Sequence, residues 1–176
     1  MMTPSDELEL QNFDIEIRSD GRWFHEGGEI KRLGLVKLFA SVLSCDDEGR
    51  YWLTTPVEKG EIRVQDAPFV IQAMRCVGEG DAQVIYLQDN IEREHKLCQA
   101  TPLEMRVDKS GHARPFILLD KGLCALIKHA VFYELAEIAM AAASHGQPLD
   151  EGYEENPDAL VLLSDGASFS LMGPSA

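Results

Sequence analysis

The stretch FDIEIRSDGRWF, residues 13–24, shows how the first part of this chain folds. Apolar and charged residues alternate over residues 13–18, and a period of two is typical of a strand with one buried face. Asp20-Gly21 follows, a dipeptide that tolerates the positive φ angles of a tight hairpin turn. The sequence therefore predicts a β-hairpin whose returning strand covers residues 22–25.

Downstream of this hairpin, the pattern changes to that of a helix. Leu35, Leu38, Phe39 and Val42 are spaced i, i+3, i+4 and i+7, so we expect a helix that turns this face to the core. Short apolar runs separated by Gly, Pro and Asp then predict a series of strands. The expected strands cover residues 51–53, 61–64, 69–77, 83–88, 94–98, 103–107 and 115–119.

A second helix is predicted over residues 122–143, where a wide apolar stripe repeats at helical spacing. Asp120 is the expected N-cap, because its carboxylate can accept hydrogen bonds from the first-turn N–H groups. Residues 147–158 contain five acidic side chains and are expected to form a solvated loop. A last hairpin, centred on Asp165-Gly166, is predicted within residues 160–171.

The order strand, helix, strand occurs twice along the chain, which predicts an α+β fold of two similar units. We expect a disordered or extended N-terminus over residues 1–12, an N-terminal unit over 13–68 and a C-terminal unit over 69–173. The pattern alone leaves open whether this recurrence reflects an internal duplication or chance.

Composition excludes several classes of function. The chain has 176 residues with 16 Lys and Arg against 30 Asp and Glu, a net charge of −14. Such a charge disfavours binding to nucleic acid or to an anionic membrane surface. No stretch approaches the ~20 apolar residues needed to span a bilayer, and the acidic start lacks the apolar region of a secretory signal. Four cysteines without a CxxC pair indicate reduced thiols, so we expect a cytoplasmic protein.

Motifs for catalysis and for metal binding are lacking. The five histidines show neither HExxH nor HxH spacing, and no GxSxG, GxxxxGK[ST] or GxGxxG occurs. The sequence therefore predicts no metal, no cofactor and no catalytic residue. It favours a non-enzymatic protein and leaves an enzyme as the alternative.

A candidate ligand site is encoded around residues 55–66. Lys59 and Arg63 lie close together and could neutralise a phosphate, Arg63 through its planar fork and Lys59 as a point charge. Asp66 could accept a ribose hydroxyl or a base amino group. The alternative is a solvated strand face whose screened ion pairs contribute about 0–1 kcal/mol each.

Three further residues are candidates for ligand binding. Asn90 ends a predicted strand and could cap a turn or contact a ligand. Arg114 precedes a proline, which favours an extended backbone. Tyr133, on the predicted second helix, either faces the seam between the two units or is a core aromatic whose hydroxyl reaches a partner at the edge.

The chain resembles a bacterial family called domain of unknown function 1285. The most specific likeness is TPVEK (residues 55–59) followed by DAPF (66–69), and RPF (114–116) with GLCALI (122–127) also matches its style. The resemblance covers about residues 13–173. It implies a duplicated α+β core whose second unit resembles a pleckstrin-homology fold, an antiparallel sheet packed on one long helix. It also implies a nucleotide-like ligand in a crevice between the units, and a role in bacterial signal transduction.

These observations favour a non-enzymatic sensor or adaptor that binds a nucleotide-like small molecule between its two units. A signalling protein is a possible further partner. One alternative is a hydrolase acting on a nucleotide-type substrate with Asp66 as the base. Another is a protein–protein interaction module that recognises a peptide at a sheet edge.

Overall fold

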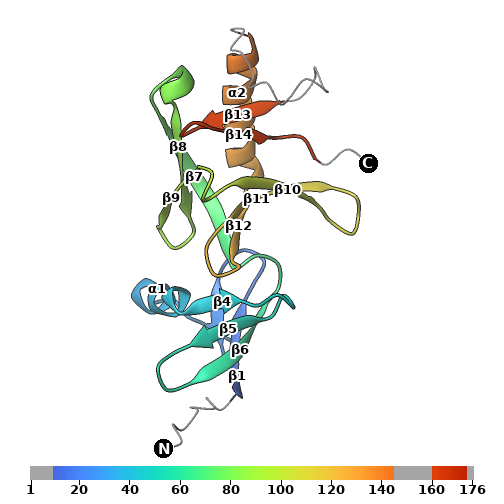
Figure 1. Ribbon diagram of the computed structural model, residues 1–176. Coiled ribbons are helices and arrows are strands. Elements are labelled where there is room, and N and C mark those ends of the chain that lie inside the picture. Colours follow the sequence, from blue (N-terminus) through green and yellow to red (C-terminus); the bar gives the residue numbers. More distant parts are fainter. Residues whose placement is uncertain (1–9, 145–159, 174–176) are drawn as a thin grey trace, which may run out of the picture. The chain divides into compact units, whose positions relative to one another are not determined.

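The computed structural model describes residues 10–144 and 160–173, which fold into two units (Figure 1). The first unit comprises the described part of Met1–Pro68 together with Asp120–Leu123, and the second comprises Phe69–Leu119 and the described residues from Cys124 onward. Each contains a six-stranded sheet and one α-helix. The expected α+β fold of two similar units is confirmed. The loop expected at 147–158 and most of the expected N-terminal segment lie outside the described residues.

The sheet of the first unit consists of two three-stranded meanders joined in the middle. Its strand order is β3-β2-β1-β6-β5-β4, with β1 and β6 parallel and all other neighbours antiparallel. Helix α1 connects the two meanders. The expected hairpin around Asp20-Gly21 is present as β1–β2. The elements are β1 (Leu10–Ile17), β2 (Trp23–His25), β3 (Gly28–Glu29), α1 (Leu33–Ser41), β4 (Leu43–Cys45), β5 (Tyr51–Thr54) and β6 (Lys59–Val64).

Helix α1 buries a different face from the one expected. Val36 and Ala40 are its buried residues, whereas the side chain of Leu38 is 61% exposed. The expected face through Leu35, Leu38, Phe39 and Val42 is therefore wrong in part. Apolar residues fill most positions of this nine-residue helix, so their spacing does not single out one face.

The sheet of the second unit repeats the topology of the first. Its order is β10-β11-β12-β7-β8-β9, with two antiparallel meanders joined by the parallel pair β7·β12. The wholly antiparallel sheet expected here is thus corrected to a mixed one. The elements are β7 (Phe69–Val77), a 3₁₀ turn η1 (Gly80–Ala82), β8 (Val84–Asp89), β9 (Glu94–Lys96), β10 (Leu103–Val107), β11 (Ala113–Leu118), β12 (Cys124–Ile127), α2 (His129–Ser144), β13 (Val161–Ser164) and β14 (Ala167–Ser170).

The repeat lies in the sheets, not in the order strand–helix–strand. Helix α1 lies between the third and fourth strands of its unit, whereas α2 follows the sixth strand of the other unit. The third and fourth strands of the second unit are connected without an α-helix, through a turn closed by the bridge between Cys98 and Thr101. The expectation of two equivalent helices is corrected accordingly.

The helix expected over residues 122–143 begins seven residues later than expected. Residues Cys124–Ile127 form β12, which pairs with β7 in parallel, and α2 starts at His129. Asp120 does not cap a helix, because Lys121 and Gly122 have φ angles of 55° and 70°. The apolar run of β12 is buried within the sheet, and a short run of that kind cannot be told from a helix by its periodicity.

Both cores are closely packed around the central strands. Large apolar side chains with less than 2% exposure occur in each unit, most of them on the parallel strands and on their neighbours. At about 25 cal/mol per Å² of apolar surface, such burial is the main stabilising contribution in each unit. The set comprises Ile17, Trp23, Leu43 and Leu53 in the first unit, and Phe69, Ile71, Ile85, Leu87, Ile91, Leu97, Ile117 and Ile127 in the second.

The hairpin β13–β14 confirms the turn expected at Asp165-Gly166, where both residues have positive φ angles. Its turn end is attached to the main sheet by Ser164, which is fully buried. The Ser164 hydroxyl accepts a hydrogen bond from the Ile85 amide at 2.9 Å and donates one to the Leu97 carbonyl at 2.6 Å. The Asp165 amide donates to the Gln83 carbonyl at 2.9 Å. The hairpin is therefore fixed at its turn.

Three other hairpin turns share one aspartate-centred loop. Asp46, Asp89 and Asp108 each accept hydrogen bonds from the backbone amides two and four residues later, at 2.8–3.0 Å. The residue three positions after the aspartate has a positive φ angle in each loop, and is Gly49 or Gly111 in two of them. Such side-chain-to-backbone bonds are what favours Asp at the start of turns.

Asp89 is the buried member of this set. Its carboxylate also accepts hydrogen bonds from Arg93 Nε at 2.9 Å and lies 2.9 Å from His95 Nε2. Burial raises the pKa of Asp89, but the hydrogen bonds from His95 and Arg93, together with the charge of Arg93, outweigh burial and lower that pKa. The Arg93 guanidinium in turn lies 4.0 Å above the ring of Phe69. Asp89 thus organises the β8–β9 loop and holds a cation against the core.

We expect Asp89→Asn to lower the free energy of unfolding by about 3 kcal/mol, because it removes one partner of a buried ion pair. Asp108→Asn makes the same change in a loop of the same kind, but at a more exposed aspartate. It should lower the free energy of unfolding clearly less than Asp89→Asn does. The lowered pKa makes the Asp89 contribution present above pH ~4, the usual carboxyl range, and lost as the pH falls further. Urea unfolding of both variants between pH 3 and 7 measures this, and equal losses for the two variants would contradict it.

Gly122 is a position where the backbone conformation and the close surroundings both favour glycine. Its φ is 70°, and a Cβ atom there would lie 2.6 Å from the carbonyl oxygen of Cys45. Gly122→Ala should therefore destabilise the first unit by ~2 kcal/mol or more. Gly111→Ala is the matched control, since its φ is 82° and its surroundings are open, and it should cost only about 1 kcal/mol. Equal unfolding midpoints in denaturant for the two variants would refute the steric argument.

Candidate functional site

A basic cavity lies at the start of helix α2 in the second unit. Its volume is about 250 Å³. Three of the six side chains that line it are basic, and none is acidic. The lining residues are Arg114, Pro115, Leu126, Ile127, Lys128 and His129.

Strand pairing brings these residues together. Arg114 and Pro115 lie on β11, and Leu126 and Ile127 lie on the neighbouring β12. The Lys128 amide donates to the Ile71 carbonyl at 3.3 Å, which continues the pairing of β12 with β7 by one residue. The Lys128 carbonyl then accepts the Phe132 amide at 2.9 Å, the first hydrogen bond of α2. Lys128 is thus the residue at which strand becomes helix.

The backbone and the side chains at the start of α2 both contribute positive potential. The first turn of a helix has amide groups without intrahelical partners, and the helix dipole is positive at this end. The first turn of α2 contains no acidic residue. Lys128 and His129, both exposed, add basic side chains at the same place, and Arg114 adds a third from β11. The arrangement is suited to an anion.

Tyr133 lies one helical turn beyond His129 and on the same side of α2, four residues later. Its side chain is 66% exposed, so Tyr133 is not a core aromatic. Two of the six candidate residues, Arg114 and Tyr133, therefore lie around the first two turns of one helix. Lys128 and His129 were missed because the helix was expected to begin near residue 121, which placed both inside it.

Arg63 lies in a shallow hollow of the first unit. The hollow has a volume of about 380 Å³ and is lined by residues of β1, β5 and β6 and by the β4–β5 loop. Its charges are mixed, since Glu16 and Glu61 line it together with Arg50 and Arg63. The Arg63 side chain is 73% exposed and lies 3.5 Å from Asp14. These features are those of a solvated strand face, as in the alternative expected from the sequence.

Lys59 does not line this hollow; its Nζ lies 4.7 Å above the ring of Trp52. The Trp52 indole donates to Asp46 at 2.9 Å, and Arg50 binds the same carboxylate at 3.0 Å. The hydrogen bond from Trp52, followed by those from Arg50, lowers the pKa of Asp46 to about 2. Lys59 thus belongs to a packed cluster around Trp52. Asp66 is half-buried in the turn after β6.

Asn90 links its turn to another strand. Its side-chain oxygen accepts the Val70 amide at 2.9 Å and so joins the β8–β9 loop to β7. Asn90 is not among the residues that line the basic cavity. The ligand roles of Lys59, Arg63, Asp66 and Asn90 stay predictions.

Two further observations concern residues 10–144 and 160–173. Within these ranges no group of three or more His, Cys, Asp or Glu side chains is arranged to hold a metal ion. The four cysteines carry free thiols, and burial raises the pKa of Cys45 and Cys76. In the part of the chain that the structure describes, the helices are too short or too polar to cross a membrane.

The comparisons with known proteins agree with the two-unit fold. The chain matches the domain of unknown function DUF1285, N-terminal domain, over residues 4–67 and the protein of unknown function DUF1285, C-terminal domain, over residues 68–171. No match is found among curated proteins.

Two crystal structures are similar along most of the chain. A DUF1285 family protein from Silicibacter pomeroyi DSS-3 is 31% identical with a TM-score of 0.77, over 95% of this chain and 84% of that one. A DUF1285 family protein from Shewanella baltica OS155 is 25% identical with a TM-score of 0.57, over 72% of this chain and 92% of that one. The family resemblance seen in the sequence is thereby confirmed: this chain belongs to the DUF1285 family, whose function is unknown.

Proposed function

We propose that this protein is a non-enzymatic sensor or adaptor of bacterial signal transduction, and that the basic cavity at the start of α2 binds the phosphate of a nucleotide-like small molecule. The observation that supports the proposal is the placement of Lys128 and His129 at the N-terminal end of α2, next to Arg114.

Electrostatics argue that this end of α2 is shaped for an anion. A cation at the positive end of a helix dipole is unfavourable, and such charge–dipole interactions are typically about 0.3–1 kcal/mol. Two basic residues occur here in a chain whose net charge is −14. A bound phosphate would reverse the sign of this interaction and accept the first-turn amides.

The lining suits a phosphate more than a whole nucleotide. Lys128 offers a compact charge and the first-turn amides of α2 offer directed donors, which are complementary ways of binding phosphate. A cavity of about 250 Å³ is below the ~300–1,000 Å³ usual for drug-sized ligands. The remainder of the ligand would lie outside, where the exposed ring of Tyr133 is available for stacking on a base.

The hydrolase alternative is less well supported. Its proposed base, Asp66, is not among the residues that line the basic cavity. The cavity itself is lined by no carboxylate, hydroxyl or thiol side chain. These observations favour binding without turnover. A ligand site between the two units, with Lys59, Arg63 and Asp66 contributing to it, stays a prediction.

Titration calorimetry with pyrophosphate, with nucleoside mono- and diphosphates and with the parent nucleosides tests the proposal. We expect a nucleoside phosphate to bind and its nucleoside not to bind. Lys128→Gln and His129→Gln should each weaken binding at least about tenfold, because a neutral, differently placed amide replaces the ammonium of Lys128 or the ring of His129. Tyr133→Ala should weaken nucleotide binding but not pyrophosphate binding.

Lys109→Gln is the matched control, because it removes the same charge from the exposed turn between β10 and β11, away from the cavity. It should leave binding unchanged. Lack of binding at millimolar ligand, or equal losses in the Lys109 and Lys128 variants, would refute the proposal. Release of inorganic phosphate from the bound nucleotide would favour the hydrolase instead.

A further inference from the structure

The outer edge of β10 presents unused backbone hydrogen-bonding groups. β10 is the last strand of its sheet and has a neighbour, β11, on one side only among the described strands. The bond from the Asp108 amide to the His112 carbonyl fixes the register of this hairpin. Because paired and unpaired positions alternate in an antiparallel ladder, Leu103 and Met105 turn their N–H and C=O groups away from β11. Pro115, which lacks an N–H, lies opposite Met105 and agrees with this register.

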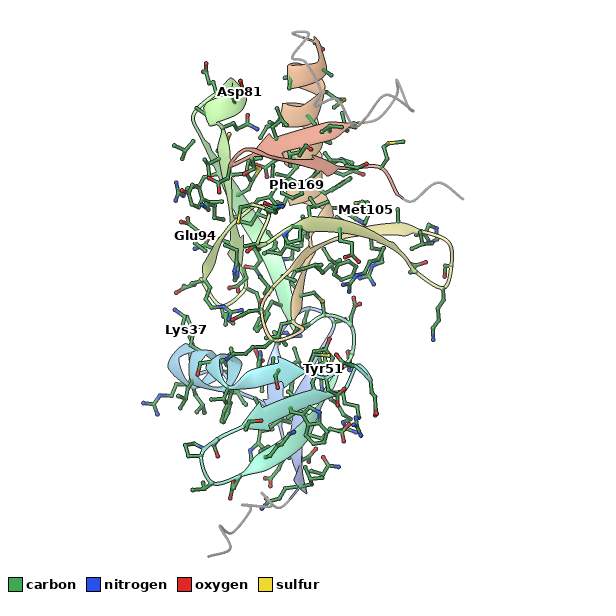
Figure 2. The ribbon with its side chains drawn as sticks, viewed as in Figure 1. Lys37, Tyr51, Asp81, Glu94, Met105 and Phe169 are labelled. Carbon is green, nitrogen blue, oxygen red and sulfur yellow. The ribbon has the colours of Figure 1, made fainter. Side chains whose placement is uncertain are left out.

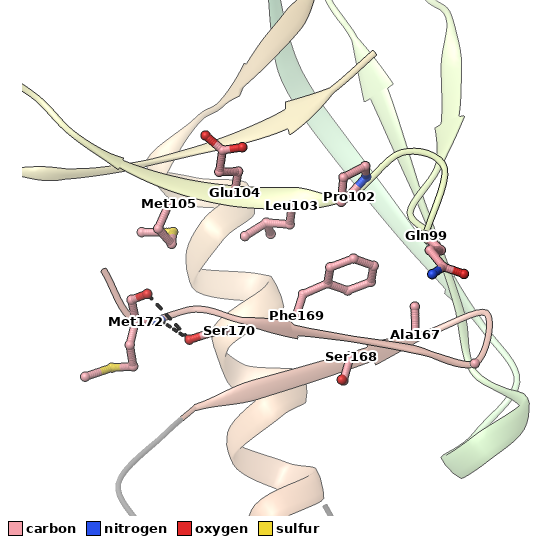
Figure 3. A pocket seen from close by; sticks show the side chains of 11 residues that line it. Gln99, Pro102, Leu103, Glu104, Met105, Ala167, Ser168, Phe169, Ser170 and Met172 are labelled. Atoms are coloured by element: carbon pink, nitrogen blue, oxygen red, sulfur yellow. Dashed lines mark hydrogen bonds between the residues drawn. The ribbon is translucent and has the colours of Figure 1, made fainter. Parts of the chain in front are cut away.

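A cleft of about 660 Å³ adjoins this edge, between β10 and the hairpin β13–β14 (Figure 3). The two strands belong to different sheets, and Figure 3 shows the side chains of Leu103 and Phe169 pointing toward one another across the cleft. Met105 and Phe169, both labelled in Figure 2, mark its two walls. The lining residues are Gln99, Pro102 to Met105, Gly166 to Ser170, and Met172.

The cleft has a mixed lining, in which polar surface slightly exceeds apolar surface. Leu103 and Phe169 are buried at its base, and the Met172 side chain beside them is 48% exposed. Gln99 and Ser168 provide neutral polar groups, and Glu104 is paired with Arg106 at 2.7 Å. Such a lining suits uncharged side chains, with apolar ones placed over Leu103, Phe169 and Met172.

The far wall of the cleft is held in place before any ligand arrives. Ser164 fixes the turn of the β13–β14 hairpin by its two buried hydrogen bonds, to the Ile85 amide and the Leu97 carbonyl. Lys96 binds Asp165 at 2.8 Å at the same end. A preformed cleft lowers the ordering cost of binding.

We propose that the free edge of β10 and the adjoining cleft bind an extended peptide segment of another protein. The main chain of the peptide pairs with Leu103 and Met105 and so extends the sheet by one strand. Every second side chain of the peptide is apolar and enters the cleft, over Phe169 and Met172. The inference does not depend on the ligand proposed above for the basic cavity.

Two features favour a peptide over another occupant. The outward-facing groups of Leu103 and Met105 repeat every second residue, about 6.6–6.8 Å apart, which is the repeat of another strand. The cleft lies beside that edge, where the alternate side chains of an added strand would point. Main-chain pairing then contributes affinity, and the cleft selects side chains.

A display library of random linear peptides, screened against the full chain, tests this proposal. We expect enriched sequences with apolar residues at alternate positions and without proline between them. In hydrogen exchange read by NMR, the Leu103 and Met105 amides should exchange fast in the free protein and at least about tenfold more slowly when a selected peptide is bound. The Glu104 amide, which faces β11, should be protected in both states.

Met105→Pro is the sharpest variant, because it removes the outward N–H and leaves the β10–β11 ladder its own bonds. It should weaken peptide binding at least about tenfold, whereas Met105→Leu, which keeps the N–H, should change it little. If Met105→Pro does not fold, peptides methylated at single backbone nitrogens give the same test with the unaltered protein. A single methyl group should abolish binding when its nitrogen faces β10, which is the case at every second residue of the peptide. A methyl group on the nitrogens between them should be tolerated.

Several results would overturn the proposal. They are a library without enrichment, binding that protects no amide of β10, and binding that Met105→Pro or backbone methylation leaves unchanged. A stable dimer whose β10 amides are already protected without peptide would also overturn it, because the edge would then belong to a second copy of the chain.

Discussion

The parallel pairing of a first strand with a last strand is the constraint on which both units depend. β1 pairs with β6 in one unit and β7 with β12 in the other. Parallel neighbours cannot be joined by a tight turn. The other strands of each sheet therefore lie within the long connection between its two parallel strands. The buried residues of the second pair show what stabilises it: Phe69 and Ile71 on β7, and Ala125 and Ile127 on β12, are all at most 1% exposed. If this central pair separated, each meander would lose its partner.

The same pairing explains how the basic cavity of the second unit is positioned. In the first unit the chain leaves β6 as a loop, whereas in the second unit it passes from β12 straight into α2 through Lys128. The bond from the Lys128 amide to Ile71 belongs to the sheet, and the bond from Phe132 to the Lys128 carbonyl belongs to the helix. The start of α2 is therefore held at the end of β12 and next to β11. Its position relative to Arg114 follows from the sheet and not from a flexible loop.

Local patterns in the sequence predict the fold where one short-range rule dominates. Alternation over residues 13–18 and the Asp-Gly dipeptides predict hairpins correctly, because positive φ angles and period-two burial leave few alternatives. The apolar run of β12 was read as helix, since its strand character comes from pairing with residues more than fifty positions away. Tertiary pairing, not propensity, decides such a run.

The candidate site was harder to predict for the same reason. Lys59 and Arg63 are close in sequence and occupy one strand, yet one packs on Trp52 and the other extends into solvent. Arg114 and Lys128 lie fourteen positions apart and line one cavity, because β11 and β12 are neighbours and α2 begins where β12 ends. A cluster that is assembled by sheet order has no signature in spacing along the chain.

The β10–β11 strand pair connects the basic cavity to the cleft beside β10. Pro115 lines the cavity, Met105 lines the cleft, and the two residues lie directly opposite one another in the β10–β11 ladder. A sensor requires that occupancy of one site change the free energy of binding at another. A displacement of one strand can pass directly to the strand paired with it, without an intervening loop. In addition, a first ligand that orders one strand reduces the conformational entropy that a second ligand must remove. If both proposed sites are occupied in turn, linkage requires that the effect of ligand on peptide affinity equal that of peptide on ligand affinity. The β10–β11 pair is an element through which such a coupling would run, because one of its strands lines each site.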